Sequence, residues 1–263
     1  MLSMWTPLPW RQLCNSKTLL LPYLLLAAHI VAAKPLADEK PLADEEPLAD
    51  EKPLANEQPS ASKEPAPRAK PMRRLHILNP TDLSQWQEKS FSGHSVYNID
   101  LSHDPVAVKA HSKASASGLF REIRVDLTQT PYINWSWKID NTLENLNETS
   151  KAGDDYVARI YVVVSGGFWF WKTRALNYVW SSHQANGSHW PNAFTANAHM
   201  LAVDSGNQQA KRWVHHKRNV LQDLARYLQL DAQELDAVAI MTDTDNSGQS
   251  ATAYYGPIYF SSE

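Results

Sequence analysis

The sequence predicts an all-β fold, a sandwich or barrel with one or two short helices. From Leu75 onward, short apolar segments rich in Val, Tyr and Trp alternate with turn residues. Many short strands with few helical segments are typical of β-sandwiches and barrels. The predicted strands cover residues 95–101, 106–112, 118–127, 132–140, 155–164, 175–182, 199–205, 237–243 and 253–260.

One segment, 219–230, has helical spacing instead. Val220, Leu221, Leu224 and Leu228 fall on one face, and Asn219 is a good N-cap residue. We expect this helix to pack its apolar face against an edge of the sandwich.

Residues 1–33 read as a signal peptide. Arg11 and Lys17 precede a short apolar run, and Val31 and Ala33 suit cleavage before residue 34. The alternative is an uncleaved membrane anchor, but the run is shorter than the roughly 20 residues of a spanning helix and contains Pro22. We therefore expect a periplasmic or secreted protein, with membrane contact only if this segment stays attached.

Residues 34–72 read as a disordered, Pro-rich linker before a β-sandwich domain at 73–263. Proline recurs every six residues at positions 35, 41, 47, 53 and 59, between charged residues that cannot build a core. An extended spacer holding the domain away from a surface is one interpretation. A repeat expanded without a selected role is the other.

Composition excludes several functional classes. A formal charge of −3 argues against nucleic-acid binding, which normally needs a basic stripe. The single cysteine, Cys14, precedes the apolar run, so neither a disulfide nor a Cys-based zinc site can form. The catalytic and phosphate-binding motifs of common enzyme classes are absent from residues 73–263, which favours a binding protein over an enzyme.

Strand alternation predicts a ligand-facing surface. In 155–164, Asp155, Arg159 and Tyr161 share a face with Val157 and Val163. Residues 238–260 read as a hairpin, in which the alternation places Met241, Asp243 and Asp245 on one side. The predicted ligand-binding set is Asp154, Asp155, Arg159, Tyr161, Met241, Asp243, Asp245, Asn246 and Tyr255.

The acidic members of this set leave three interpretations open. They could bind sugar hydroxyl groups, or Asp243 and Asp245 could bind a Ca²⁺ ion, which is the only cofactor that the sequence suggests. An EF-hand is excluded, because Tyr254 stands at the position where that loop needs Glu. Asp155 and Asp243 could instead be a catalytic pair, if they are open to solvent and roughly 5 to 10 Å apart. Asp243 could also simply pair with Arg159 inside the sandwich, with Asp245 and Asn246 forming a turn.

A second candidate contact surface is the loop containing Phe168, Trp169, Phe170 and Trp171. Four adjacent aromatic side chains cannot all point into one core, since neighbours on an extended strand point opposite ways. The loop could therefore contact a glycan, a protein or a membrane, or it could be an apolar flap over the sandwich.

Several sequence blocks together resemble one bacterial family, the domain of unknown function 3047. These blocks are "SASGLFREIRVDL", "PYINWSWKID", "GDDYVARIYVVV", "ALNYVWSS", "VLQDL" and "AIMTDTDNSGQSATAYYGPIYF". The resemblance covers roughly residues 83–260 and implies an exported protein with a jelly-roll-like β-sandwich, similar to galactose-binding or carbohydrate-binding modules. It implies no established activity and no catalytic residues. The segment "GGFWFWKT" at 166–173 departs from it, so the aromatic loop is particular to this chain.

The leading hypothesis is an exported cell-envelope β-sandwich that binds carbohydrate or another envelope component without catalysis. One alternative is a glycan-active hydrolase or lyase using Asp155 and Asp243. Another is an envelope assembly protein that uses the loop from Phe168 to Trp171.

Overall fold

The computed structural model describes residues 72–167 and 172–263. The predicted signal segment, almost all of the predicted linker and the loop from Phe168 to Trp171 lie outside these residues. Among the described residues, no helix is both long and apolar enough to span a lipid bilayer.

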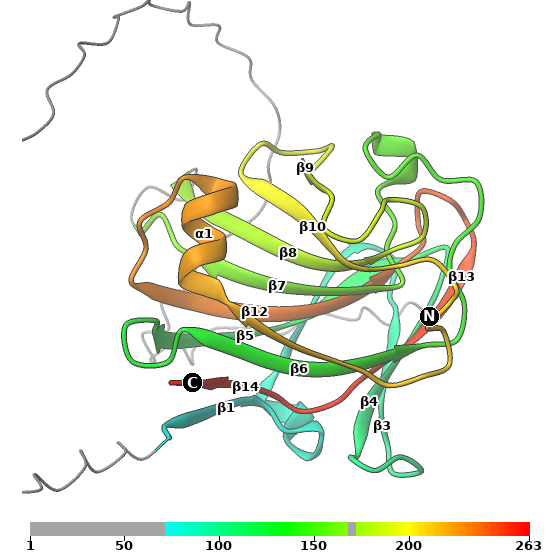
Figure 1. The fold of residues 1–263 in the computed structure, drawn as a ribbon. Helices are drawn as coiled ribbons and strands as arrows, with labels where there is room; N and C mark the ends of the chain where they lie inside the picture. The colour runs from blue at the N-terminus through cyan, green and yellow to red at the C-terminus, as the bar shows by residue number, and fades with distance from the viewer. Residues whose placement is uncertain (1–71, 168–171) are drawn as a thin grey trace, which may run out of the picture.

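Two sheets of seven strands each form a β-sandwich in the described part of the chain (Figure 1). The first, called sheet A, has the order β1 (Arg74–Leu78), β14 (Ile258–Ser261), β6 (Tyr132–Ile139), β13 (Ser250–Tyr255), β4 (Ala107–Lys113) and β3 (Val96–Asp100), with β11 (Val214–Asn219) also paired to β6. The second, called sheet B, has the order β2 (Gln87–Ser92), β5 (Ala116–Asp126), β12 (Glu234–Asp243), β7 (Ala158–Val164), β8 (Arg174–Ser181), β10 (Ala198–Ser205) and β9 (His189–Pro191). Only the β8–β10 pair is parallel among the described strand pairs.

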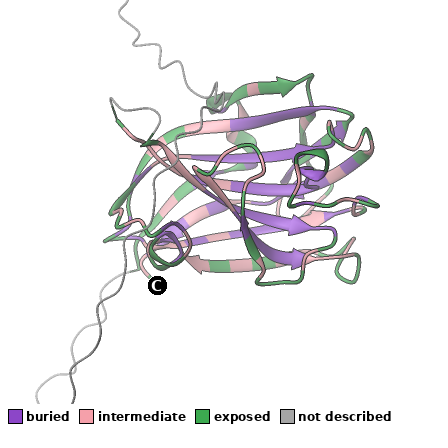
Figure 2. Cartoon of the chain, turned by 90° about the horizontal axis from the view of Figure 1, so that it is seen from above, coloured by how far each residue is buried: buried purple, intermediate pink, exposed green. Residues whose placement is uncertain are grey.

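The core lies between the two sheets, and buried residues are concentrated along the central strands (Figure 2). Trp135 and Trp137 on β6 are both buried and touch edge to face, with ring centroids 5.5 Å apart. On β8, the core residues are Leu176, Tyr178 and Trp180. The predicted all-β sandwich is therefore confirmed.

The predicted helix is also present, as α1 (Val220–Leu228). The Asn219 side chain caps it by accepting a hydrogen bond from the Gln222 N–H. Val220, Leu224 and Leu228 are buried in the core, and the helix packs against β8 and β11. Two short 3-10 helices, η1 (Pro80–Gln85) and η2 (Lys151–Gly153), complete the described elements.

The predicted hairpin at 238–260 is wrong. β12 pairs with β5 and β7 in sheet B, whereas β13 pairs with β4 and β6 in sheet A. The loop 244–249 crosses from one sheet to the other, a step of about 10 Å that six residues span easily. The predicted strand 253–260 is likewise two strands, because the chain leaves the regular ladder at Gly256 and Pro257.

Candidate functional site

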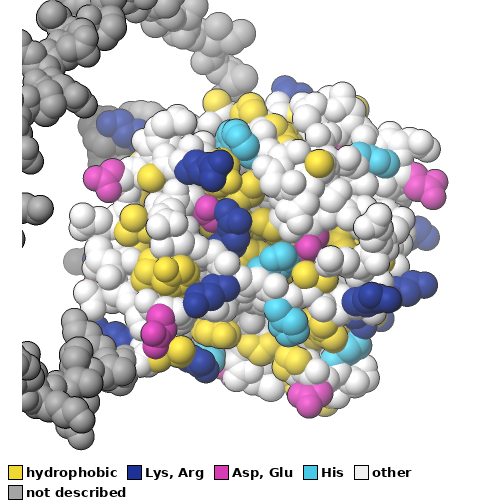
Figure 3. Space-filling view, viewed as in Figure 1, with side chains coloured by type: hydrophobic (Ala, Val, Ile, Leu, Met, Phe, Trp, Pro, Cys, Tyr) yellow, Lys and Arg dark blue, Asp and Glu magenta, His cyan; other side chains and the backbone are white. Residues whose placement is uncertain are grey.

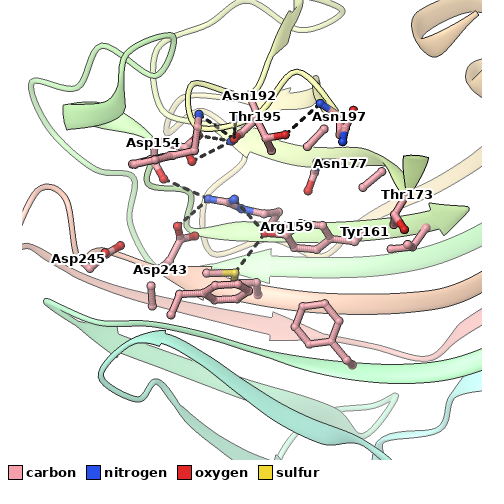
Figure 4. Close-up of a pocket in the computed structure, with 18 of the residues that line it drawn as sticks. Asp154, Arg159, Tyr161, Thr173, Asn177, Asn192, Thr195, Asn197, Asp243 and Asp245 are labelled. Atoms are coloured by element: carbon pink, nitrogen blue, oxygen red, sulfur yellow. Dashed lines mark hydrogen bonds and ion pairs between the residues drawn. The ribbon is translucent and has the colours of Figure 1, made fainter. Parts of the chain in front are cut away.

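A pocket of about 400 Å³ lies on the outer face of sheet B (Figure 4). Its floor is built by alternation on β7: Ile160 and Val162 face the core, so Arg159, Tyr161 and Val163 face the opposite way and line the pocket. Met241 on β12, which pairs with Arg159, extends the floor. The volume falls within the roughly 300–1,000 Å³ of typical small-ligand sites.

The loop after the edge strand β9, which pairs with β10, forms one wall. Trp190 on β9 joins Tyr156, Val179, Met200 and Ala202 in a second apolar cluster, which covers part of the outer face of sheet B. The residues after β9 then turn toward the pocket, and Asn192, Phe194, Thr195 and Asn197 line it. The outer face of sheet B thus carries this apolar cluster and, beside it, the pocket.

Aromatic rings line one end of the pocket, and polar side chains line the opposite end. Phe120 lies 6.1 Å from Tyr161 and 6.4 Å from Phe91, measured between ring centroids. Phe91 and Phe194 are both 49% exposed, although large apolar side chains usually avoid water. Exposed aromatic faces beside polar groups are a contact surface for an amphipathic ligand.

Arg159 is the centre of the polar end. Its Nη2 donates to Asp243 Oδ2 at 2.6 Å and to the Asp154 carbonyl at 3.2 Å, and its Nη1 donates to the Tyr161 hydroxyl at 2.9 Å. The guanidinium also stacks on the Tyr156 ring, 4.4 Å from its centroid. The predicted pair of Asp243 with Arg159 is present, but on the outer face of sheet B and not between the sheets: both side chains are about 95% buried, and both contribute to the pocket lining.

Three aspartates, Asp154, Asp243 and Asp245, line the pocket together with Arg159. Burial raises the pKa of Asp154, and of Asp245, whose neighbour Asp155 raises it further. Burial also raises the pKa of Asp243, while the positive charge of Arg159 opposes that rise. The polar end is therefore rich in hydrogen-bond acceptors, and burial makes each negative charge on its carboxyl groups costly.

The proposed calcium ligands are already committed to nitrogen donors. Carboxylate oxygens of Asp155, Asp243 and Asp245 come within 4.8 Å of one another. However, Asp155 accepts hydrogen bonds from the Asn246 and Ser247 N–H groups, and Asp243 accepts from the Tyr156 N–H as well as from Arg159. Ca²⁺ prefers about six to eight oxygen ligands, so this donor set does not fit it.

Two residues of the predicted set do not line the pocket. Asp155 is fully buried, and its carboxylate accepts hydrogen bonds from two backbone N–H groups of the loop 244–249. Tyr255 is fully buried in the core, where its hydroxyl donates to the Met241 carbonyl. The catalytic alternative required Asp155 and Asp243 to be open to solvent, but they are 0% and 2% exposed, so the structure does not bring them together as an accessible pair.

The remaining predicted residues, which include Asp154, Tyr161, Met241, Asp245 and Asn246, do line the pocket. Sequence reasoning missed three asparagines and three phenylalanines of the lining: Asn177, Asn192, Asn197, Phe91, Phe120 and Phe194. Alternation within β8 could have placed Asn177 on the outer face, because its neighbours Leu176 and Tyr178 are core residues. Nothing in the sequence marks Phe91 or Asn192, which reach the site from a polar strand and from a loop.

The face shown in Figure 3 carries Lys and Arg side chains interspersed with Asp, Glu and His, without a continuous basic stripe.

Comparisons with solved structures find sandwich modules at very low sequence identity. A mutant carbohydrate-binding module of family 29 aligns at 7% identity and a TM-score of 0.36, covering 73% of this chain and 93% of that one. The family 11 carbohydrate-binding module of the cellulosomal cellulase Lic26A-Cel5E of Clostridium thermocellum aligns at 10% identity and 0.39, covering 73% and 95%. The xyloglucanase domain of NopAA from Sinorhizobium fredii aligns at 8% and 0.37, covering 67% and 92%. Each of these TM-scores is below 0.5.

No curated protein matches the chain by sequence. A family profile does, over residues 84–259, which include β5 to β8 with the pocket floor and the crossing loop after Asp243. That span agrees closely with the sequence blocks noted above, and the chain belongs to the family described as "Protein of unknown function (DUF3047)".

Proposed function

We propose that the outer face of sheet B binds carbohydrate and that the protein acts as a binding module without catalysis. The observation that carries this proposal is the pocket itself, with exposed aromatic rings at one end and amide, hydroxyl and carboxylate groups at the other. A sugar ring has the same two properties, an apolar face and a rim of hydroxyl groups. The distant structural likeness to carbohydrate-binding modules is in keeping with this proposal.

Phe91→Ala should weaken glycan binding about threefold to tenfold, because truncating a contact aromatic commonly costs about 1 kcal/mol or more. Stability should hardly change, since this ring is 49% exposed. Binding is measured by a glycan array and then by calorimetry on the full chain. Leu101→Ala is the matched control, because Leu101 is 75% exposed at the end of β3, outside the pocket lining.

The absence of binding to any glycan on the array, with or without chelator, would contradict the proposed function. An equal loss of affinity in Phe91→Ala and Leu101→Ala would show that the aromatic end of the pocket is not the contact surface.

We also propose that the protein is exported to the periplasm or beyond, with residues 34–72 holding the domain away from a surface. The sequence of residues 1–33 supports this location. Expression of the full chain in a Gram-negative host should give a soluble periplasmic product, and its intact mass should correspond to a chain that begins at Lys34. Recovery of the whole uncleaved chain in the membrane fraction would favour the anchor instead.

A further inference from the structure

Two buried polar atoms at the base of the pocket have no hydrogen-bond partner among the described residues: Asn177 Oδ1 and Arg159 Nε. The two residues are only 1% and 4% exposed. Buried polar groups are almost always paired in proteins, so an unpaired one needs an explanation. Two such atoms in the lining of one pocket indicate that something else completes them.

The orientation of the Asn177 amide is fixed by its other end. Its Nδ2 donates to the His199 carbonyl at 3.2 Å, and a carbonyl can only accept. The free atom of Asn177 is therefore an acceptor, which needs a donor from the ligand. The free atom of Arg159 is a donor, which needs an acceptor.

The strand register brings these two residues close together. Asn177 on β8 lies opposite Tyr161 on β7, and Val179 lies opposite Arg159. Asn177 and Arg159 are thus diagonal neighbours on the same face of the sheet, roughly 7–8 Å apart at their Cβ atoms. Both can reach a single sugar residue, whose hydroxyl groups each donate and accept hydrogen bonds.

The charges of the lining restrict the ligand further. Asp154, Asp243 and Asp245 line the pocket, and Arg159 is the only basic residue among the described lining residues. Arg159 already pairs with Asp243, so no positive charge remains to attract an anion. A carboxylate on the ligand would meet the two remaining aspartates and be repelled.

We propose that this pocket selects neutral saccharides, that Asn177 Oδ1 and Arg159 Nε contact two of their hydroxyl groups, and that its aspartates exclude uronic-acid glycans. This inference rests on the proposed function, because it specifies the ligand class of the same site. A neutral sugar completes both unpaired atoms, and it adds no charge to a lining that is already negative.

The test is calorimetry of the full chain with cellohexaose, maltohexaose and mannohexaose as neutral probes, and with hexagalacturonate and oligomannuronate as acidic ones. We expect the best neutral probe to bind at least about tenfold more tightly than either acidic probe, with a difference that shrinks as salt is added. A chitosan hexamer serves as the cationic probe. Equal or tighter binding of an acidic probe, or tighter binding of chitosan than of every neutral probe, would overturn the inference while leaving carbohydrate binding intact. If no saccharide binds at all, the proposed function itself fails.

Two variants test the assigned residues. Asn177→Leu removes the unpaired acceptor and should lower the affinity for the best neutral probe about tenfold or more. The control Asn98→Leu replaces an exposed asparagine on β3 and should leave that affinity unchanged. Asp245→Asn removes a half-exposed carboxylate and should raise the ratio of acidic-probe affinity to neutral-probe affinity about threefold to tenfold. Asp231→Asn makes the same change in net charge at an exposed position outside the lining and should leave that ratio unchanged. An unchanged ratio in Asp245→Asn would contradict the electrostatic exclusion even if Asn177→Leu fails to fold.

Discussion

Replacing Arg159 by methionine is expected to lower the free energy of unfolding by about 3–5 kcal/mol at neutral pH, the usual cost of removing one partner of a buried ion pair. Among the lining residues that the structure describes, Arg159 contributes the only positive charge, beside Asp154, Asp243 and Asp245. Without it, the Asp243 carboxylate is left buried, with less compensation and with like charges around it. Urea denaturation of the full chain measures the effect.

The loss in Arg159→Met should depend on pH in a direction set by Asp243. Burial raises the pKa of Asp243 in the folded protein, and the methionine variant loses the arginine that opposes this rise. A carboxyl group with a raised folded-state pKa binds protons more readily in the folded state than in the unfolded state. Its destabilising effect is therefore absent below the unfolded pKa and grows as pH rises through the folded pKa. The stability deficit of the variant should accordingly shrink between pH 7.5 and pH 5.

Two controls separate this effect from the loss of any arginine. Arg124→Met breaks an exposed pair with Glu234 and should change stability by less than about 1 kcal/mol. Adding Asp243→Asn to Arg159→Met removes the uncompensated charge and should recover part of the loss and most of its pH dependence. A deficit in Arg159→Met that stays constant across this pH range would show that packing, and not charge, is what Arg159 supplies.

The sequence predicts the strands well where one face is buried. β6 alternates apolar and polar residues, so its core face can be read directly. The strands β2 and β11, with the sequences "QEKSFS" and "VHHKRN", carry no such signal, because they lie at sheet margins and bury little. Their pairing partners decide their structure, and a single sequence does not show those partners.

The polar end of the site was predictable only in part, and Asp155 shows why. Alternation counted from Arg159 places Asp155 and Val157 on the pocket face. The strand begins only at Ala158, however, and Val157 is a fully buried member of the main core. Alternation fails wherever the backbone is not yet extended. Even for Asn177, alternation indicates an outward face but not which outward face holds a pocket, because the walls come from distant segments such as the loop after β9.

The buried position of Asp155 predicts a second large loss of stability. Asp155→Ala should lower the free energy of unfolding by about 3 kcal/mol, since hydrogen bonds to a charged group contribute roughly 1.5–3 kcal/mol each. The Asp155 carboxylate accepts from the Ser247 N–H at 2.6 Å and from the Asn246 N–H and side-chain Nδ2 at 3.1 and 3.2 Å. It thereby satisfies two backbone donors in the loop that joins the sheets.

The same substitution should also weaken glycan binding, because that loop supplies Asp245 and Asn246 to the pocket lining. Asp155 itself does not line the pocket, so any change in binding must act through the position of the loop. Asp126→Ala is the matched control: this exposed carboxylate also accepts from a backbone N–H, that of Thr128, but in a surface turn, so its loss should be much smaller. Denaturation measures the stability of both variants, and calorimetry with the best neutral probe, at a temperature where both remain folded, measures their binding. Lower stability of Asp155→Ala with unchanged affinity would show that the crossing loop supports the sandwich but does not shape the site.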